Sequence, residues 1–419
     1  MSAMTSSPTR RSVLTTAGTA ALLLATTGTA TADRRAAGAT AGVKPGHREG
    51  RIQLTLPAPT GRRPIGTTSL HLIDRSRQDP WRSPPAPREL MISLWYPVRE
   101  TGGRPRAAWL TPAAAELNKQ QTSRSLQTSL DDVDYPVTHA YQDAPVRGRH
   151  PVVLFSPGYG SMRVLGTALV EELAGQGYIV VTIDHTYESQ IVEFPGGRLE
   201  VSRLPAKSTD EDIAKALRIR QDDTRFVLDE LARLNAGASP NAQHRRLPHG
   251  LPGSFDLSRT GMFGHSLGGD TAAETMAQDP RIRAGVDLDG SINGTVAATG
   301  LDRPFLLMAS AGHGRDNDPS WAEFWSHLRG WRRELQLRDS GHLAFSDLAP
   351  LTQQLIKALP IPPAVVTRLV ASIGTLDASR AVSVQRAYLH AFFDLHLRQR
   401  DHHLLSRPSA RFPEIEFIP

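Results

Sequence analysis

The sequence predicts an α/β fold in which a mostly parallel central sheet is covered by helices on both faces. Short apolar runs at 152–155, 178–183 and 284–288 are separated by helix-length segments, the pattern of parallel strands joined by right-handed crossovers. The chain has 419 residues, of which 39% are hydrophobic and 21% charged. This length and composition suit one large globular α/β core.

The expected elements follow one another along the chain. Apolar residues alternate over 88–98 and predict an early strand, and further strands are expected at 260–263, 304–308 and 334–338. A helix is expected over 164–175. A capping box at 208–211 predicts the start of a long amphipathic helix. The stretch 237–254, rich in Gly, Pro, Asn and His, is expected to be an insertion loop.

The N-terminal residues have the features of an export signal. Arg10 and Arg11 precede a mildly apolar stretch, and small residues at 30–32 offer a cleavage site. We expect a twin-arginine signal peptide at 1–32, a flexible leader at 33–50 and the folded domain at 51–419. The expected location is therefore outside a bacterial cell. The alternative is an unstructured tail with a chance Arg pair.

The composition excludes several classes of protein. The chain has no Cys, which excludes a disulfide scaffold, an Fe–S protein, a Cys nucleophile and a thiolate zinc site. It also suits a protein that folds in the reducing cytoplasm before export. The net charge of +6 is spread along the chain, which argues against a nucleic-acid partner. We expect no cofactor and no metal, and the sequence does not predict the oligomeric state.

A Gly-His-Ser-Leu-Gly sequence at 264–268 carries the clearest chemical signal. It follows an expected strand and precedes a helix-length segment, the arrangement of the nucleophile elbow in the α/β-hydrolase fold. Glycines are needed there because a strained turn brings backbone segments together. Ser266 is the expected nucleophile. The alternative is a glycine-rich turn with an incidental Ser.

A serine hydroxyl requires a base to become a good nucleophile. His342 follows the last expected strand, where a loop can reach back over the elbow, and is the expected base. His313, in a Gly-flanked loop, and His327 are rivals for this role. His402 and His403 near the C-terminus are expected to be solvated surface residues.

Two positions compete for the acid that orients the base. Asp289 ends the strand after the elbow helix, whereas Asp316 and Asp318 lie beyond the next strand. The strand-exit position before a turn-forming Gly favours Asp289, although Asp287 lies on the same face of that strand. A weak calcium site at 316–318 is a further alternative.

The oxyanion of an acyl-transfer reaction needs two N–H donors. The amide of Leu267, directly after the nucleophile, is the first expected donor. The Ser-Pro-Gly-Tyr-Gly loop at 156–160 offers the amide of Tyr159 as the second. The alternative for this loop is an ordinary strand-exit turn.

Two segments have apolar faces at helical spacing. An aromatic stripe includes Trp321, Phe324, Trp325 and Leu328, and a second apolar helix is expected over 351–359. Such stripes belong to the core or to a surface that contacts lipid. Both interpretations stay open at the level of sequence.

Four segments, at 155–160, 264–269, 285–289 and 341–345, together resemble the secreted platelet-activating-factor acetylhydrolases and their bacterial lipase-like relatives. The likeness covers about 90–347. It implies an α/β-hydrolase with Ser266 as nucleophile, Asp289 as acid and His342 as base, and oxyanion amides at the two positions named above. It also implies calcium-independent hydrolysis of short or oxidised sn-2 acyl chains of phospholipids. Pro157 departs from the His usual in the animal enzymes, and the aromatic-poor stretch 290–300 leaves the acyl preference open.

The residues by themselves predict less than the resemblance does. They predict a serine carboxylic ester hydrolase that works through an acyl-enzyme, with an ester or phospholipid substrate and a transient contact with a lipid surface. A polyester or triglyceride hydrolase on the same scaffold is one alternative. A non-catalytic surface-binding relative is another, and the intact set of Ser266, Asp289 and His342 argues against it.

Overall fold

The computed structural model describes residues 50–419. The expected signal peptide at 1–32 and all but the last residue of the expected leader lie outside the described residues. Within the described residues, none of the helices combines the length and the apolar composition needed to cross a membrane.

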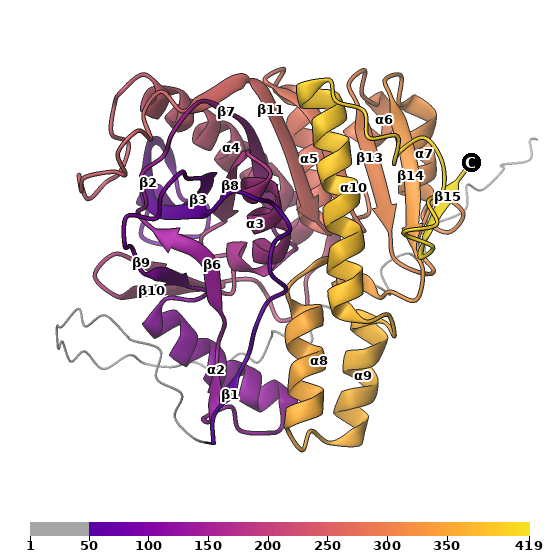
Figure 1. Ribbon diagram of the computed structural model, residues 1–419, viewed down its shortest axis with the longest axis horizontal. Helices are drawn as coiled ribbons and strands as arrows, with labels where there is room; N and C mark the ends of the chain where they lie inside the picture. Colours follow the sequence, from indigo (N-terminus) through magenta and orange to yellow (C-terminus); the bar gives the residue numbers. More distant parts are fainter. Residues whose placement is uncertain (1–49) are drawn as a thin grey trace, which may run out of the picture.

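A sheet of 11 strands forms the centre of the fold (Figure 1). In spatial order its strands are β15 (Ile415–Ile418), β14 (Arg332–Leu337), β13 (Phe305–Ala309), β12 (Ile282–Leu288), β11 (Phe255–His265), β7 (His150–Ser156), β8 (Ile179–Asp184), β3 (Pro87–Pro97), β2 (Ile65–Gln78), β6 (Val137–Gln142) and β4 (Arg106–Ala108). The strands from β14 to β8 pair in parallel. Antiparallel pairs flank them, with β15 on β14 and with β3 between β8 and β2. The predicted, mostly parallel sheet is confirmed.

Helices cover both faces of this sheet. On one face lie α4 (Asp210–Asn235), α5 (Leu267–Gln278), α6 (Val296–Thr299) and α7 (Pro319–His327). On the other lie α3 (Thr167–Gly175), which follows the 3-10 turn η2 (Arg163–Gly166), and the long α10 (Ala378–Arg398), which crosses the front of the sheet in Figure 1. Each face has its own hydrophobic core, built from the alternate sides of the same strands.

A third hydrophobic core lies at one end of the molecule, the lower end in Figure 1. It is built mainly from α2 (Pro112–Leu126), α8 (Leu348–Ala358), α9 (Pro363–Ile373) and the short parallel pair β1 (Ile52–Gln53) and β5 (Val133–Asp134). The 3-10 turn η3 (His342–Phe345) contacts α8 and α9, and the hairpin β9 (Ile191–Phe194) and β10 (Arg198–Val201) contributes to the same end. This end therefore supports the turn that carries His342.

The expected elements agree with the observed ones, with small shifts in their bounds. The strand expected at 260–263 is longer and spans Phe255–His265, and the stretch 237–254 forms only turns and loops, as expected. The capping box lies one residue later than expected. Thr209 is the N-cap, its hydroxyl accepts the amide proton of Asp212, and the Asp212 carboxylate accepts that of Thr209.

The aromatic stripe belongs to the core. Trp321 and Phe324 are fully buried, and the indole N–H of Trp321 donates to the carbonyl of Gly290 at 2.5 Å. Trp325 is half-buried between the guanidinium groups of Arg315 and Arg332. The alternative in which this stripe contacts lipid is therefore wrong for the two buried rings.

Candidate active site

Ser266 lies at a strained turn between β11 and α5. Its φ of 54° and ψ of −128° are unusual for a residue with a side chain. The flanking glycines are required by backbone contact. A Cβ at Gly264 would lie 2.1 Å from the backbone of Gly268, and a Cβ at Gly268 would lie 2.0 Å from the carbonyl oxygen of Ser156. The local geometry is therefore that of a nucleophile elbow.

Asp289 and His342 are brought together beside this turn. Asp289 follows β12 with a φ of 64° and is 4% exposed. Its Oδ2 lies 2.6 Å from Nδ1 of His342, and its Oδ1 accepts the amide proton of Ser310 at 2.6 Å. The amide of Ser266 donates to the carbonyl of Leu288 at 2.9 Å, which ties the elbow to the end of the strand that carries Asp289.

His265, inside the Gly-x-Ser-x-Gly sequence, holds the backbone of His342. Its Nε2 donates to the carbonyl oxygen of His342 at 2.9 Å, and the two rings lie 4.6 Å apart. Burial and the neighbouring His342 lower the pKa of His265 to about 3. His265 is therefore neutral, and its single ring proton is used in this hydrogen bond.

His313 is the second imidazole on Asp289. Its Nδ1 lies 2.8 Å from Asp289 Oδ1 and its Nε2 lies 3.0 Å from Asp318 Oδ2. Because both acceptors are carboxylates, both ring nitrogens must carry a proton. Burial opposes this charge, but the two hydrogen bonds outweigh burial and raise the pKa of His313 to about 10. His313 is an imidazolium whose single positive charge lies between two buried carboxylates.

The carboxylate of Asp289 is stabilised in its charged form by these contacts. Burial alone would raise its pKa, but the hydrogen bonds from His313 and His342 hold the pKa of Asp289 well below its ordinary value. From the sequence, His313 was a rival candidate for the role of base. In the structure it contacts Oδ1 of Asp289, whereas His342 contacts Oδ2. The other rival, His327, lies near the carbonyl of Ala297 and does not contact Asp289.

The segment 316–318 caps a helix. Asp318 is the N-cap of α7, where its Oδ1 accepts from the amide of Ser320, and its Oδ2 faces His313. The side-chain amide of Asn317 bonds to the backbone of Gly314 and Gly312. The side-chain oxygens of Asn317 and Asp318 are thus already engaged in hydrogen bonds within the protein, and nothing in this geometry favours the calcium alternative. Asp316 is exposed.

Arg220 of α4 fixes the loop that precedes Tyr159. The Arg220 side chain is 1% exposed and donates to the carbonyls of Pro157 at 2.5 Å and Gly158 at 2.9 Å. The C=O and N–H of a trans peptide point in opposite directions, so the N–H of Tyr159 points away from Arg220. A Cβ at Gly158 would lie 3.4 Å from the Cβ of Ser266, which shows that this loop lies against the elbow.

A buried polar network holds Arg220 in place. Its guanidinium pairs with Glu188 and donates to Ser156 Oγ at 3.2 Å. Burial lowers the pKa of His185, so this neutral ring accepts from Ser156 and donates to Asp223. Arg220 was not predicted from the sequence, because no local pattern distinguishes it from the other basic residues of α4.

The side chains of both expected oxyanion donors meet in one apolar cluster. Leu267 is buried against Ala216 and Leu217, and the partly buried Tyr159 and Trp81 pack against the same group. The phenol of Tyr159 is fixed by a 3.0 Å hydrogen bond with Ser208. The side chains of Tyr159 and Leu267 therefore form part of one apolar wall beside the elbow.

Asp287, two residues before Asp289, faces a different environment. Its Oδ1 accepts the amide proton of Gly290 at 2.9 Å. Its Oδ2 has no hydrogen-bond partner among residues 50–419, and neither does the Oδ1 of Asp270. Burial raises the pKa of Asp270 to about 7 and that of Asp287 well above its ordinary value. Asp287 is therefore a neutral acid behind the elbow, in contrast to the ionised Asp289.

Comparisons with known proteins identify a family of esterases. The family model described as platelet-activating factor acetylhydrolase, isoform II, matches residues 56–403. A probable 1-alkyl-2-acetylglycerophosphocholine esterase of Arthroderma benhamiae is 30% identical over 389 residues, which cover 87% of this chain and 93% of the relative. The platelet-activating factor acetylhydrolase of Cavia porcellus is 26% identical over 221 residues, which cover 50% of this chain and 51% of the relative.

A solved structure has the same fold. The ferulic acid esterase of Streptomyces cinnamoneus superimposes with a TM-score of 0.71 at 37% sequence identity, over 88% of this chain and 99% of that one. The family match extends beyond the segment 90–347 that carries the resemblance in the sequence and confirms it. This chain is a carboxylic ester hydrolase with the α/β-hydrolase fold, and it belongs to the family of platelet-activating factor acetylhydrolase, isoform II.

Proposed function

We propose that Ser266, His342 and Asp289 carry out the hydrolysis, and that the substrates are esters with a short acyl group, of the 1-alkyl-2-acetylglycerophosphocholine type. The observation that supports this proposal most is the 2.6 Å contact between His342 and Asp289 beside a serine held at positive φ. Each of the three groups has the chemistry that its role in a Ser-His-Asp mechanism requires.

The mechanism follows from which nitrogen of His342 is free. Nδ1 donates to Asp289, so Nε2 is left to take the proton from Ser266 Oγ as this oxygen attacks the ester carbon. When the tetrahedral intermediate collapses, the bond to the leaving oxygen breaks and His342 returns the proton to that oxygen. Water then attacks the acyl-enzyme, gives its proton to His342, and the acid leaves as Ser266 regains its hydrogen.

The negative charge of the tetrahedral intermediate needs fixed donors. We assign this role to the amides of Tyr159 and Leu267, assisted by the N-terminus of α5. A single such donor contributes about 2.7–4 kcal/mol to the transition state. Arg220 acts as a positioning residue, because it sets the direction of the peptide that contains the Tyr159 amide.

His313 is also a positioning residue in this proposal. Together with the Ser310 amide it occupies Asp289 Oδ1 and leaves Oδ2 to His342. This fixes the rotation of the carboxylate and keeps Asp289 ionised.

The fungal relative supports this choice of substrate, because its name refers to a 1-alkyl-2-acetyl phospholipid. The alignment with this chain covers 93% of that relative. A second candidate is an aromatic ester of the ferulate type, because the Streptomyces cinnamoneus esterase is 37% identical over nearly its whole length. A polyester or triglyceride hydrolase is a third alternative on the same scaffold.

A parallel release assay distinguishes these substrates. The purified enzyme is given an acetyl phospholipid, a long-chain phospholipid, methyl ferulate and a short triglyceride, with the Ser266→Ala variant as a control for each. We expect the acetyl phospholipid to have the highest kcat/KM and all four activities to disappear in the variant. A higher kcat/KM for methyl ferulate would replace the phospholipid proposal with the aromatic ester.

We also propose that the protein is exported through the twin-arginine route, on the basis of Arg10 and Arg11 and the small residues at 30–32. Expression in a bacterial host with this route should release a chain that begins at Asp33. Replacement of both arginines by Lys should keep the precursor inside the cell. Equal release of the two proteins would contradict the proposal.

A further inference from the structure

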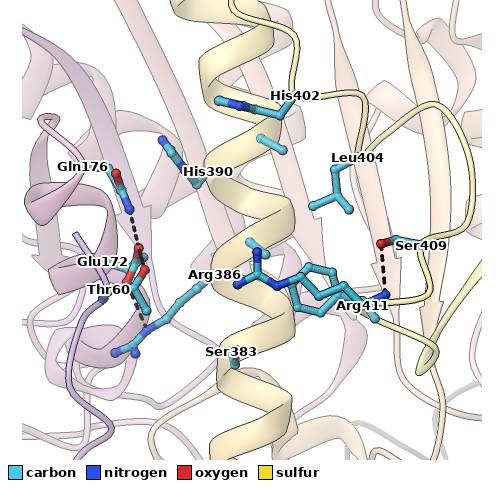
Figure 2. Close-up of a pocket in the computed structure, with 13 residues that line it drawn as sticks. Thr60, Glu172, Gln176, Ser383, Arg386, His390, His402, Leu404, Ser409 and Arg411 are labelled. Carbon is cyan, nitrogen blue, oxygen red and sulfur yellow. Dashed lines mark hydrogen bonds and ion pairs between the residues drawn. The ribbon is translucent and has the colours of Figure 1, made fainter. Parts of the chain in front are cut away.

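A cavity of about 340 Å³ lies between α3, α10 and the segment that follows α10 (Figure 2). None of its lining residues is among those that surround Ser266. Two imidazoles line this cavity. His390 comes from α10, and His402 comes from the C-terminal segment and lies above the helix in Figure 2. His402 is exposed, as expected for a solvated surface residue, and its ring also reaches back to Asp394 of α10.

The carboxylate of Asp394 joins the two imidazoles. Its Oδ2 lies 3.3 Å from Nε2 of His390 and 2.9 Å from Nε2 of His402. One ligand atom from each residue lies within 4.8 Å of the others. Four-coordinate zinc has bonds of about 2.0–2.2 Å to nitrogen and oxygen, which separates its ligand atoms by about 3.4 Å. The distance from Asp394 to His390 is close to this separation before any ion is present, and the distance to His402 would have to increase by about 0.5 Å.

The local structure explains why these groups converge. His390 and Asp394 are four residues apart on α10 and therefore share one face of the helix. Gln399 ends the helix with a φ of 57°, which turns the chain back along the helix. This turn brings His402 within 5.4 Å, ring centre to ring centre, of His390.

The second oxygen of Asp394 is held by other groups. Oδ1 accepts from the hydroxyl of Tyr178 at 2.5 Å and from Arg398 at 3.0 Å. The guanidinium of Arg398 also donates to the carbonyls of Gln176 and Gly177, so its charge lies on the Oδ1 side. Such outer hydrogen bonds orient a ligand carboxylate and here direct Oδ2 towards the two histidines.

We propose that His390, Asp394 and His402 bind one zinc ion, with water as the fourth ligand. Two imidazoles and one carboxylate are a ligand set that zinc accepts. The ion would connect α10 to the segment 399–414, which leads to β15 at the edge of the sheet. Its role is structural and separate from ester hydrolysis. Zinc that binds only the folded state raises the melting temperature.

Neighbouring histidines provide a matched pair of variants. The side chains of His402 and His403 are 45% and 79% exposed, so truncation of either one leaves no buried cavity. His403 faces Asp401 rather than Asp394. Untagged, EDTA-treated wild type, His402→Ala and His403→Ala are titrated with ZnCl2 by calorimetry. Co2+ serves as a spectroscopic probe of a four-coordinate site.

We expect one zinc ion per chain in the wild type and in His403→Ala, with a zinc-dependent rise in melting temperature and the visible absorption of four-coordinate Co2+. The His402→Ala variant should bind zinc at least about 100-fold more weakly, because loss of a direct ligand should cost at least as much as loss of an outer hydrogen-bond partner. Its melting temperature should not change when zinc is added. If the wild type binds no zinc at this stoichiometry, or if His402→Ala binds it as tightly, the three residues form only an ion-pair cluster and the proposal is wrong.

Discussion

His313 and His342 share the carboxylate of Asp289, with one imidazole on each of its oxygens. His313 Nδ1 lies 2.8 Å from Oδ1 and His342 Nδ1 lies 2.6 Å from Oδ2. A further carboxylate, Asp318, lies on the far side of His313. The acid of the proposed triad therefore lies between two imidazoles, one of them positively charged, and is not an isolated partner of the base.

Replacement of His313 by Gln should lower kcat by about tenfold to a hundredfold, the range for a hydrogen bond to a charged group worth about 1.5–3 kcal/mol. Because the pKa of His313 is raised to about 10, the advantage of the wild type over His313→Gln should also shrink as the pH rises through about 10. Rates of both proteins measured from pH 6 to pH 11 test both effects. An unchanged profile with a lower rate would indicate only a packing role.

The charge of His313 should also affect the pH dependence of stability. Its pKa is raised to about 10 in the folded protein, against about 6.5 in the unfolded chain. The resulting stabilisation is fully present below about pH 6.5 and is lost as the pH rises through about 10. We expect the difference in unfolding free energy between the wild type and His313→Gln, measured in urea, to decrease over this interval. A constant difference would show that the ring is not charged.

Matched Asn substitutions at 287 and 289 test the choice of acid. Asp289→Asn should lower kcat by about 10⁴-fold, as loss of the triad carboxylate does elsewhere. Asp287→Asn should retain nearly full activity, because burial already keeps this acid neutral and an amide oxygen can still accept from Gly290. Steady-state kinetics of the two variants suffice. The reverse order of activities would exclude Asp289 as the orienting acid.

Replacement of Arg220 by Lys should impair the proposed oxyanion site. A lysine cannot donate to the carbonyls of Pro157 and Gly158 while it also pairs with Glu188. We expect kcat to fall by about 10- to 100-fold, less than the roughly 10²–10³ for loss of a whole donor, with a smaller change in KM. Arg218→Lys, on the exposed side of α4, is the control. Equal kinetics for the two variants would show that Arg220 does not position the proposed oxyanion site.

Much of the fold could be predicted because its signals are local. The apolar runs gave the parallel strands, and the glycines at 264 and 268 marked a turn at which the structure leaves no room for a Cβ. β2 was not predicted, because Thr67 and Thr68 are buried in it beside apolar residues and its end is charged. The short β15 was missed because four residues carry too little pattern.

The missed parts of the site depend on contacts between distant segments. Arg220 reaches Gly158 across 62 positions of the chain, and His313 reaches Asp289 across 24. His402 is exposed, as expected, but its contact with Asp394 was not predicted, because this contact depends on the reversal of the chain at Gln399. No periodicity or motif in the sequence predicts such long-range contacts, so only the tertiary structure shows them.

The central claim, that Ser266 is the nucleophile, is tested most directly by labelling with a fluorophosphonate and measuring the intact mass. We expect one label per chain in the wild type, on the peptide that contains Ser266, much slower labelling of Asp289→Asn, and no labelling of Ser266→Ala. Stoichiometric labelling of a folded Ser266→Ala variant would contradict it.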